Sequence, residues 1–214
     1  MVTTVERGAG RRYRQKSAEE RRAERRTRLL DAALDAFGTR GYARTSIEEL
    51  CTAASVSTRS FYEEFRGRED VLTELHDLIN ARVFDAVIAA LESIPGDDVA
   101  ARAEAGARAY FGTMTADPRW ARIAVVESVG VSPAMEAHRR ATLERFAALI
   151  QAEADRLAAA GVVATRDFSL TARALVGVFL ELLNTWSPQR DLRSFVDDVS
   201  GEAARLIVAS VVQP

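Results

Sequence analysis

The stretch SVSTRSFYEEFRGRED, residues 55–70, decides how the N-terminal part of this chain folds. Residues 55–57 interrupt the apolar pattern, and the last of them, Ser57, is a natural N-cap for a following helix. Phe61 and Phe65 stand one helical turn apart and predict a buried face. The segment therefore predicts a tight turn followed by a short helix that packs on one side.

The other side of this short helix is polar. With Phe61 and Phe65 inward, a rotation of about 100° per residue turns three side chains outward: Arg59, Tyr62 and Arg66. Ser60 lies beside them, and Thr58 stands at the helix start, where a side chain can reach forward regardless of face. Arginine can donate two hydrogen bonds to guanine, and serine or threonine can contact several bases. The residues alone leave two interpretations open, a helix that reads DNA and an ordinary solvated face.

Two more helices are predicted before the turn. Thr45 and Ser46 give a start signal, and apolar residues follow at the spacing of one helical face: Ile47, Leu50, Cys51 and Ala54. An earlier helix begins near Ser17, with a glutamate three residues later as in a capping box, and is expected to stop at Gly38 and Gly41. A helix, a tight turn and a second helix form the geometry that lays the second helix in a DNA major groove.

Longer helices are predicted in the rest of the chain, punctuated by proline and glycine. Their expected ranges are 68–93, 98–116, 118–128, 132–160, 168–186 and 191–212. No stretch alternates with the period of a strand. The sequence predicts an all-α fold of about nine helices, with a small three-helix head and a larger helical body.

Composition and charge limit the class of protein. Apolar residues make up 48% of the 214 residues and charged residues 28%, which is typical of a folded globular chain. Residues 1–30 carry a net charge of +6, whereas residues 71–214 carry −5. We predict a disordered basic arm over residues 1–16. Because no signal peptide or membrane-spanning stretch occurs, we expect a cytoplasmic protein without a membrane partner.

Catalytic and metal-binding patterns are not found in the sequence. The chain has one cysteine, Cys51, and its histidines, His76 and His138, each follow a glutamate by two residues, which puts each pair on opposite sides of a helix. Cys51 is expected to be a buried apolar residue. We therefore predict no enzyme activity, no catalytic residues, no cofactor and no metal site.

Two sets of residues in the body suggest binding surfaces. The first comprises aromatic, soft apolar and polar residues that are either ordinary core or the lining of a pocket for a mostly apolar small molecule: His76, Phe84, Tyr110, Phe111, Met114, Trp120, Glu127 and Phe179. The second is surplus apolar surface on the last two helices, which suggests a subunit interface: Leu175, Phe179, Leu182, Leu183, Phe195, Val199 and Leu206.

The run GYARTSIEELCTAASVSTRSFYEEFRGREDVL, residues 41–72, strongly resembles the helix-turn-helix of the TetR family of transcriptional repressors. The resemblance implies that Thr58, Arg59 and Ser60 face bases, while other residues face phosphates. The phosphate-facing set is Thr45, Ser46, Tyr62 and Arg68, to which Ser57 is added as a helix N-terminus. It also implies a small-molecule effector in the body and a homodimer formed by the last two long helices.

The expected function is thus a ligand-responsive repressor that binds double-stranded DNA at a palindromic operator. The expected domains are an arm at 1–16, a helix-turn-helix domain at 17–67 and a ligand-binding and dimerisation domain at 68–214. Two rivals are an all-α carrier protein, which leaves residues 45–68 unexplained, and a divergent helical enzyme, which lacks a catalytic cluster.

The sequence departs from the family pattern at two places. Ser55 stands in the turn where many members have glycine, and Glu63 and Glu64 stand where basic or histidine residues are common. Glu63 either accepts a hydrogen bond from cytosine or lies beyond the groove. Because residues 55–70 carry a net charge of −1, non-specific DNA affinity should depend on Arg68 and the arm.

Overall fold

The computed structural model describes residues 17–186 and 191–212, and this part of the chain contains α-helices, one 3-10 turn and one π-helical turn but no strand. The predicted arm at 1–16 lies outside the described residues. The elements are α1 (Ala18–Thr39), η1 (Tyr42–Arg44), α2 (Ile47–Ala54), α3 (Thr58–Glu64), α4 (Arg68–Ser93), α5 (Val99–Thr115), α6 (Pro118–Arg122), η2 (Ile123–Glu127), α7 (Pro133–Ala159), α8 (Ser169–Asn184) and α9 (Leu192–Val212). The predicted all-α fold is confirmed.

Side-chain caps start the helices of the head. The Ser17 hydroxyl accepts a hydrogen bond from the Glu20 backbone N–H, and the Ser17 N–H donates to the Glu20 carboxylate at 2.7 Å. Ser46 and Glu49 form a second capping box at the start of α2. Such reciprocal bonds satisfy N–H groups that the first helical turn leaves unpaired. Local sequence is therefore sufficient to set where α1 and α2 begin.

Two predicted boundaries need correction. Gly38 lies inside α1 and does not end it, because α1 continues to Thr39. The glycine is needed for packing: a Cβ at Gly38 would lie 2.4 Å from the Cβ of Arg119 on α6. The single helix expected at 118–128 is instead α6 followed by the π-helical turn η2.

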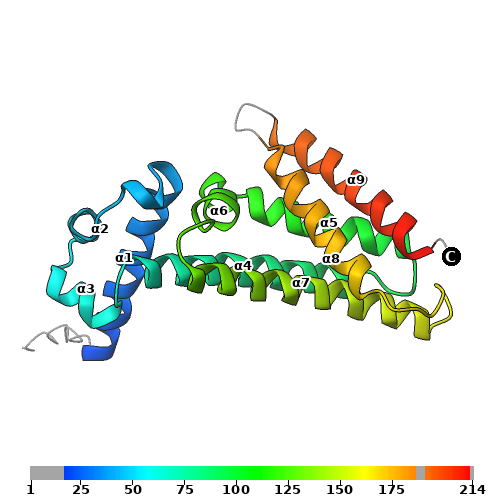
Figure 1. The fold of residues 1–214 in the computed structure, drawn as a ribbon, viewed down its shortest axis with the longest axis horizontal. Coiled ribbons are helices and arrows are strands. Elements are labelled where there is room, and N and C mark those ends of the chain that lie inside the picture. Colours follow the sequence, from blue (N-terminus) through cyan, green and yellow to red (C-terminus); the bar gives the residue numbers. More distant parts are fainter. Residues whose placement is uncertain (1–16, 187–190, 213–214) are drawn as a thin grey trace, which may run out of the picture.

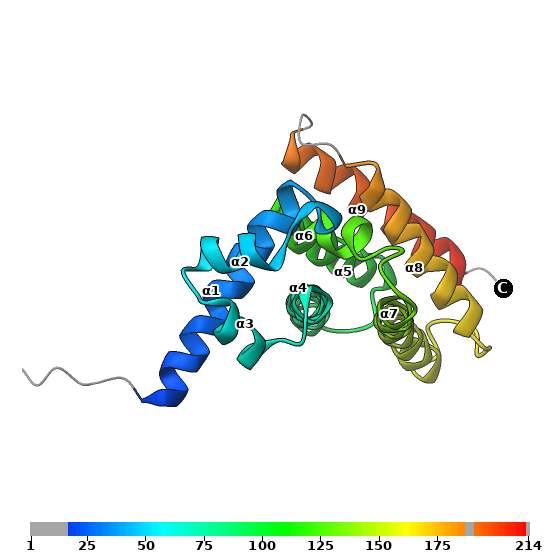
Figure 2. The ribbon, with the colours of Figure 1, turned by 60° about the vertical axis from the view of Figure 1, so that its left-hand side comes forward.

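The helices form a head and an elongated body (Figures 1 and 2). Helices α1 to α3 form the head, and α4 leaves it to run along the body beside α7. Helix α5 packs against both α4 and α9, while α8 packs against α7 and α9. Among the described residues, no helix combines the length and the apolar character that crossing a membrane requires.

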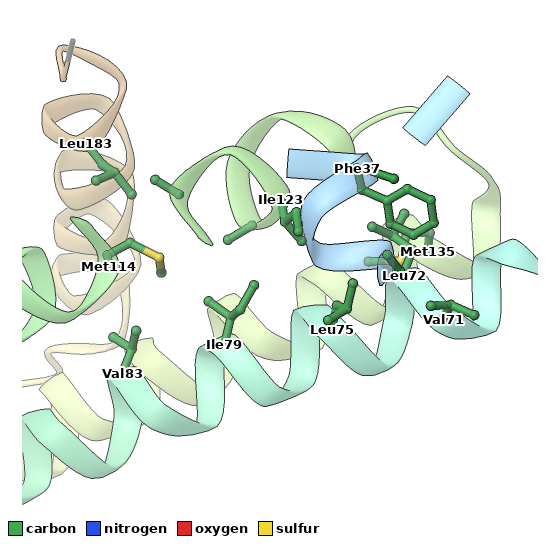
Figure 3. Packing of buried hydrophobic residues seen from close by; sticks show 14 of the residues in the cluster. Phe37, Val71, Leu72, Leu75, Ile79, Val83, Met114, Ile123, Met135 and Leu183 are labelled. Atoms are coloured by element: carbon green, nitrogen blue, oxygen red, sulfur yellow. The ribbon is translucent and has the colours of Figure 1, made fainter. Parts of the chain in front are cut away.

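One apolar core continues from the head into the body. It includes Phe37 of α1, Leu72 and Ile79 of α4, and Met114 of α5 (Figure 3). Phe37 and Leu72 are fully buried, and α4 supplies buried residues along most of its length. Helix α4 therefore contributes to the core of the head and to the core of the body.

Candidate nucleic-acid interface and internal cavity

The turn between α2 and α3 is tight. Ser55 has φ 52° and ψ 49°, a left-handed conformation that favours glycine, and it ends α2. Ser57 then caps α3: its hydroxyl accepts from the Ser60 backbone N–H at 3.1 Å and lies 3.0 Å from the Ser60 hydroxyl. The predicted cap at Ser57 and the unusual turn conformation of Ser55 are both present.

Helix α3 has the two predicted faces. Phe61 and Phe65 are buried in the head. Thr58 and Arg59 are exposed, and 92% of the Arg59 side chain is accessible. Tyr62 is 57% exposed. The polar side chains at the start of α3 therefore project from the head without contributing to its core.

Arg66 lies beyond the C-terminal end of α3 and is exposed, as the polar face predicts. Its guanidinium pairs with the Asp70 carboxylate at 2.8 Å, and its backbone N–H donates to the same group. These bonds hold the pKa of Asp70 below its usual value. Arg66 thus helps to fix the link between α3 and α4.

Glu64 is an internal anchor of the head. Only 1% of its side chain is exposed, and its carboxylate is 3.0 Å from Arg22 and 3.2 Å from Arg25 on α1. Arg26 donates to the Glu64 backbone carbonyl at 2.9 Å and places its guanidinium over the ring of Phe65. The acidic residue that departs from the family pattern therefore ties α3 to α1 and does not face outward.

Glu63 is exposed and lies between two arginines. Its carboxylate is 3.6 Å from Arg59 within α3 and 3.8 Å from Arg25 on α1. These distances describe weak surface ion pairs. Glu63 is therefore close to the exposed face of α3, where it reduces the positive charge around Arg59.

Two predicted phosphate contacts have other roles in the structure. Thr45 is only 1% exposed and its hydroxyl donates to the Gly41 carbonyl at 2.9 Å, so its side chain is held within the head. Arg68 donates to the backbone carbonyls of Tyr42 and Thr45 and lies 4.9 Å from the Tyr42 ring centre. Arg68 therefore holds η1 and the start of α2 against α4.

A shallow hollow surrounds the N-terminus of α2. It is lined by residues 43–49 and by Arg68, and it contains Ser46 and the exposed Arg44. A helix N-terminus beside arginine side chains is a favourable place for a phosphate. Sequence reasoning did not select Arg44, although its position next to the start signal of α2 could have indicated it.

The body encloses a cavity of about 130 Å³ between α4, α5, η2, α7, α8 and α9. Most of its lining is apolar. The lining residues are His76, Asn80, Val87, Leu91, Val99, Arg102, Ala103, Gly106, Ala107, Tyr110, Met114, Ala124, Val125, Arg139, Thr142, Leu143, Phe146, Leu149, Ile150, Glu153, Ala154, Leu157, Val176, Phe179, Leu180, Ile207 and Val211.

Half of the predicted pocket residues line this cavity. They are His76, Tyr110, Met114 and Phe179. Phe111 instead lies behind the wall, with its ring stacked on Phe179 at 5.2 Å between ring centres. Burial raises the pKa of Tyr110, which keeps its phenol neutral.

Two other predicted pocket residues do not line the cavity. Phe84 packs edge-on against Phe146 with 5.6 Å between ring centres, and the Arg145 guanidinium covers its face. Trp120 lies beneath the guanidinium of Arg82, 5.1 Å from its ring centre. Phe84 thus packs between α4 and α7, and Trp120 packs between α6 and α4. The spacing of apolar residues in the sequence cannot distinguish such packing from the lining of a pocket.

Glu127 also lies outside the cavity and connects the body to the head. Its carboxylate accepts from the Tyr42 backbone N–H at 2.7 Å and from Arg122 at 2.8 Å. Arg122 in turn donates to the Thr39 carbonyl at the end of α1. Glu127 belongs to η2, and two other η2 residues, Ala124 and Val125, line the cavity. One short element therefore contacts both the cavity and the head.

Polar groups line two parts of the otherwise apolar cavity. Near one end, Arg102 pairs with Glu153 at 3.1 Å and donates to the Leu91 and Ile94 carbonyls. His76, only 3% exposed, contributes to the wall formed by α4, and its pKa is lowered to about 4 by burial and by the nearby His138 and Arg139. Near neutral pH the His76 ring is therefore uncharged.

The predicted interface residues divide into two groups. Leu175, Leu183, Phe195 and Val199 are buried inside the protomer, where they pack against its own helices. Phe179 lines the cavity, whereas Leu182 and Leu206 are half-buried. The outer surface of these two helices still carries exposed apolar residues: Leu170, Leu192 and Val212.

Comparison with known proteins agrees with this architecture. Residues 29–75 match the family model described as bacterial regulatory proteins, tetR family. The chain is 27% identical over 206 residues to the HTH-type transcriptional regulator EthR of Mycolicibacterium smegmatis, covering 94% of this chain and 87% of EthR.

Two solved structures have the same fold at low sequence identity. FadR from Bacillus subtilis, solved with stearoyl-CoA, aligns with a TM-score of 0.71 at 15% identity over 83% of this chain and 97% of FadR. AibR, solved with isovaleryl coenzyme A and operator DNA, aligns with a TM-score of 0.65 at 17% identity over 83% of this chain and 97% of AibR. Residues 29–75 therefore form a helix-turn-helix domain of the tetR family of bacterial regulatory proteins, and the chain is a DNA-binding regulator of transcription.

Proposed function

We propose that the protein is a homodimeric repressor that leaves a palindromic operator when a small, mostly apolar ligand binds in the cavity. Residues 17–67 would bind DNA, and residues 68–214 would bind the ligand and form the dimer. The observation that carries this proposal is η2, whose Ala124 and Val125 line the cavity while its Glu127 binds the head. EthR, a relative of this chain, is named a transcriptional regulator, which supports a DNA-binding function over an enzymatic one.

On the DNA side, Thr58, Arg59 and Ser60 would contact bases. Their position at the start of α3 supports this role, because recognition helices use their N-terminal residues to reach base edges. Phosphates would be contacted by Tyr62 and by the start of α2, where Ser46 and Arg44 line the hollow. Ser57, at the N-terminus of α3, is a further phosphate contact in this proposal.

On the ligand side, the size of the cavity supports a change of shape on binding. Pockets for drug-sized ligands usually measure about 300–1,000 Å³, and the cavity here is about 130 Å³. A ligand that carries an acyl chain must therefore push the surrounding helices apart. The acyl groups of the CoA ligands named for FadR and AibR support an acyl chain as the part of the effector that the cavity would hold. Displacement of η2 or α4 would then shift the head relative to the head of the second subunit.

Two copies would meet through the outer faces of α8 and α9. Leu182 and Leu206 are half-buried there, and Leu170 is 80% exposed. Apolar residues that stay accessible on paired helices favour a subunit interface. In a two-fold dimer the two α3 helices would enter the major groove about 34 Å apart, one DNA turn, so a small change in their spacing lowers operator affinity.

The test is a gel shift with DNA from upstream of the protein's own gene, at fixed salt. Arg59→Ala should weaken specific binding by about 1–3 kcal/mol, or roughly 5- to 150-fold. The control is Arg140→Ala, an exposed arginine of α7 far along the chain from the head. Unchanged affinity and specificity of Arg59→Ala would contradict the assignment of base contacts.

The effector and the dimer are tested with the same preparation. Acyl-CoAs of increasing chain length should release the DNA, and CoA alone should not. Light scattering should report two copies per particle before and after release. A monomer, or release by CoA alone, would contradict the corresponding part of the proposal.

A further inference from the structure

We propose that His76, Asp77 and His138 form a site for a divalent transition-metal ion of the Zn²⁺ type, which joins α4 to α7. The ligand atoms of these three side chains all lie within 4.8 Å of one another. The site does not depend on the proposed repressor function, because it follows from side chains that no DNA contact involves.

The three side chains converge from two helices. His76 and Asp77 are neighbours on α4, and His138 reaches across from α7. The Nε2 atom of His138 is 3.0 Å from the Asp77 carboxylate, and the two imidazole rings meet edge to face with 5.2 Å between their centres. A single ion placed between these groups would contact all three side chains.

One ring nitrogen of each histidine has no hydrogen-bond partner. The Nδ1 atom of His76 and the Nε2 atom of His138 are both buried and both lack one. His138 approaches Asp77 closely, but not with the direction of a hydrogen bond. Buried polar atoms almost always have a partner, so two unmatched imidazole nitrogens side by side require an explanation. A metal ion would satisfy both lone pairs.

The donor set indicates the class of metal. Two imidazoles and one carboxylate suit Zn²⁺ and related first-row ions, whereas Mg²⁺ and Ca²⁺ prefer oxygen ligands only. Tetrahedral Zn²⁺ with bonds of about 2.0–2.2 Å would need only a modest approach of the three ligand atoms. His76 also lines the cavity, so the fourth coordination position can be open towards a bound molecule.

The positive charge of Arg139, which lies beside His76, is already paired with a carboxylate. Arg139 lies close enough to His76 to lower its pKa. Its guanidinium, however, pairs with the Glu136 carboxylate at 3.1 Å. The Glu136 carboxylate therefore offsets the positive charge of Arg139 beside the proposed site.

A metal here would fasten α4 to α7 close to the point where α4 leaves the head. Helices α4 and α7 run side by side (Figure 1), and their contacts include Thr73 with Met135 and Phe84 with Phe146 on either side of the proposed site. The site lies just over two turns after Arg68, where α4 leaves the head. Because His76 belongs to both the site and the cavity, metal binding and effector binding should influence each other.

The experiment uses the full-length chain with its purification tag removed. The chain itself contains only two histidines, so histidines in a tag would dominate the binding of Zn²⁺. A calorimetric titration with Zn²⁺ should give a stoichiometry of one ion per protomer. The variants His138→Ala and Asp77→Asn should bind at least about 10-fold more weakly. The matched control is Asp85→Asn, an exposed carboxylate on the same helix that should leave the affinity unchanged.

A spectroscopic readout separates the proposed site from adventitious binding. Co²⁺ should give intense visible absorption bands typical of four-coordinate geometry, and His138→Ala should abolish them while circular dichroism keeps its helical signal. The proposal is overturned if Zn²⁺ shows no saturable binding. It is also overturned if His138→Ala and Asp77→Asn bind as tightly as the unaltered chain.

Discussion

The Glu127 carboxylate accepts a hydrogen bond from the Tyr42 backbone N–H at 2.7 Å, across 85 residues of sequence. This bond joins the wall of the cavity to the turn that precedes α2. Arg122 reinforces it by binding the same carboxylate and the end of α1. The structure therefore offers a direct connection between the part that would sense a ligand and the part that would bind DNA.

Replacing Glu127 with alanine should loosen this connection. The Tyr42 N–H loses its acceptor, so we expect a loss of about 1–2 kcal/mol in the free energy of unfolding. Hydrogen exchange should show faster exchange of the Tyr42 amide. Glu92→Ala, at an exposed position of α4, is the control and should change neither. Unchanged protection of Tyr42 would mean that another group can replace Glu127.

Gly38→Ala should separate the head from α6. The added Cβ would lie 2.4 Å from the Cβ of Arg119 and 3.1 Å from its Cα, so side-chain rotation alone cannot relieve the clash. We expect destabilisation of about 1–3 kcal/mol in urea unfolding, despite the better helix propensity of alanine. Gly112→Ala in α5 provides the comparison, because no atom lies near its Cβ position. Equal stability of both variants would argue against close α1–α6 packing.

Glu64→Gln should weaken the attachment of α3 to α1. The change leaves Arg22 and Arg25 without their shared carboxylate while keeping the shape of the side chain. Because the arginines can partly return to water, we expect a loss of about 1–3 kcal/mol in stability. Glu63→Gln, at the exposed neighbouring position, should stay within about 0.5 kcal/mol. The reverse order of effects would show that the anchor has been misassigned.

Ser55→Gly should preserve or raise stability, whereas Ser57→Ala should lower it. Glycine adopts the left-handed conformation of Ser55 without strain, which offsets its greater freedom in the unfolded chain. Loss of the Ser57 cap costs about 1 kcal/mol. Thermal unfolding of the two variants side by side checks both signs. A clear loss of stability in Ser55→Gly would show that the serine side chain has a role of its own.

Deleting residues 1–16 should lower DNA affinity and make it less sensitive to salt. The deleted segment holds five basic residues, and each phosphate that they neutralise contributes to the salt dependence of binding. The slope of log affinity against log salt concentration is the measurement. An unchanged slope would place the electrostatic attraction elsewhere, with Arg44 and the arginines of α1 as the next positions to test.

Local sequence predicted the elements of the fold well. Caps at Ser17, Ser46 and Ser57 and the buried faces of α1 and α3 depend on residues only three or four positions apart. Such short-range bonds can be recognised without knowledge of tertiary structure.

Contacts between residues that are far apart in the chain could not be predicted from the sequence. Thr45 looked like a surface residue, but burial by the rest of the head hides its hydroxyl. Phe195 and Val199 fit any apolar helix face, and only packing against neighbouring helices shows that the face is internal. His138 comes 62 residues after His76, so no motif could bring them together. Glu127 was selected as polar and near a pocket, yet its partner is in the head.

The exposed start of α3 bears on how such regulators could evolve new DNA targets. The head owes its stability to Phe61, Phe65 and Glu64, whereas Thr58 and Arg59 project into solvent. If these residues contact bases as proposed, mutations there would change which operator is recognised without destabilising the head. After gene duplication, a copy of this protein would then acquire new target genes through a few substitutions, while the head's core and the cavity of the body remain unchanged.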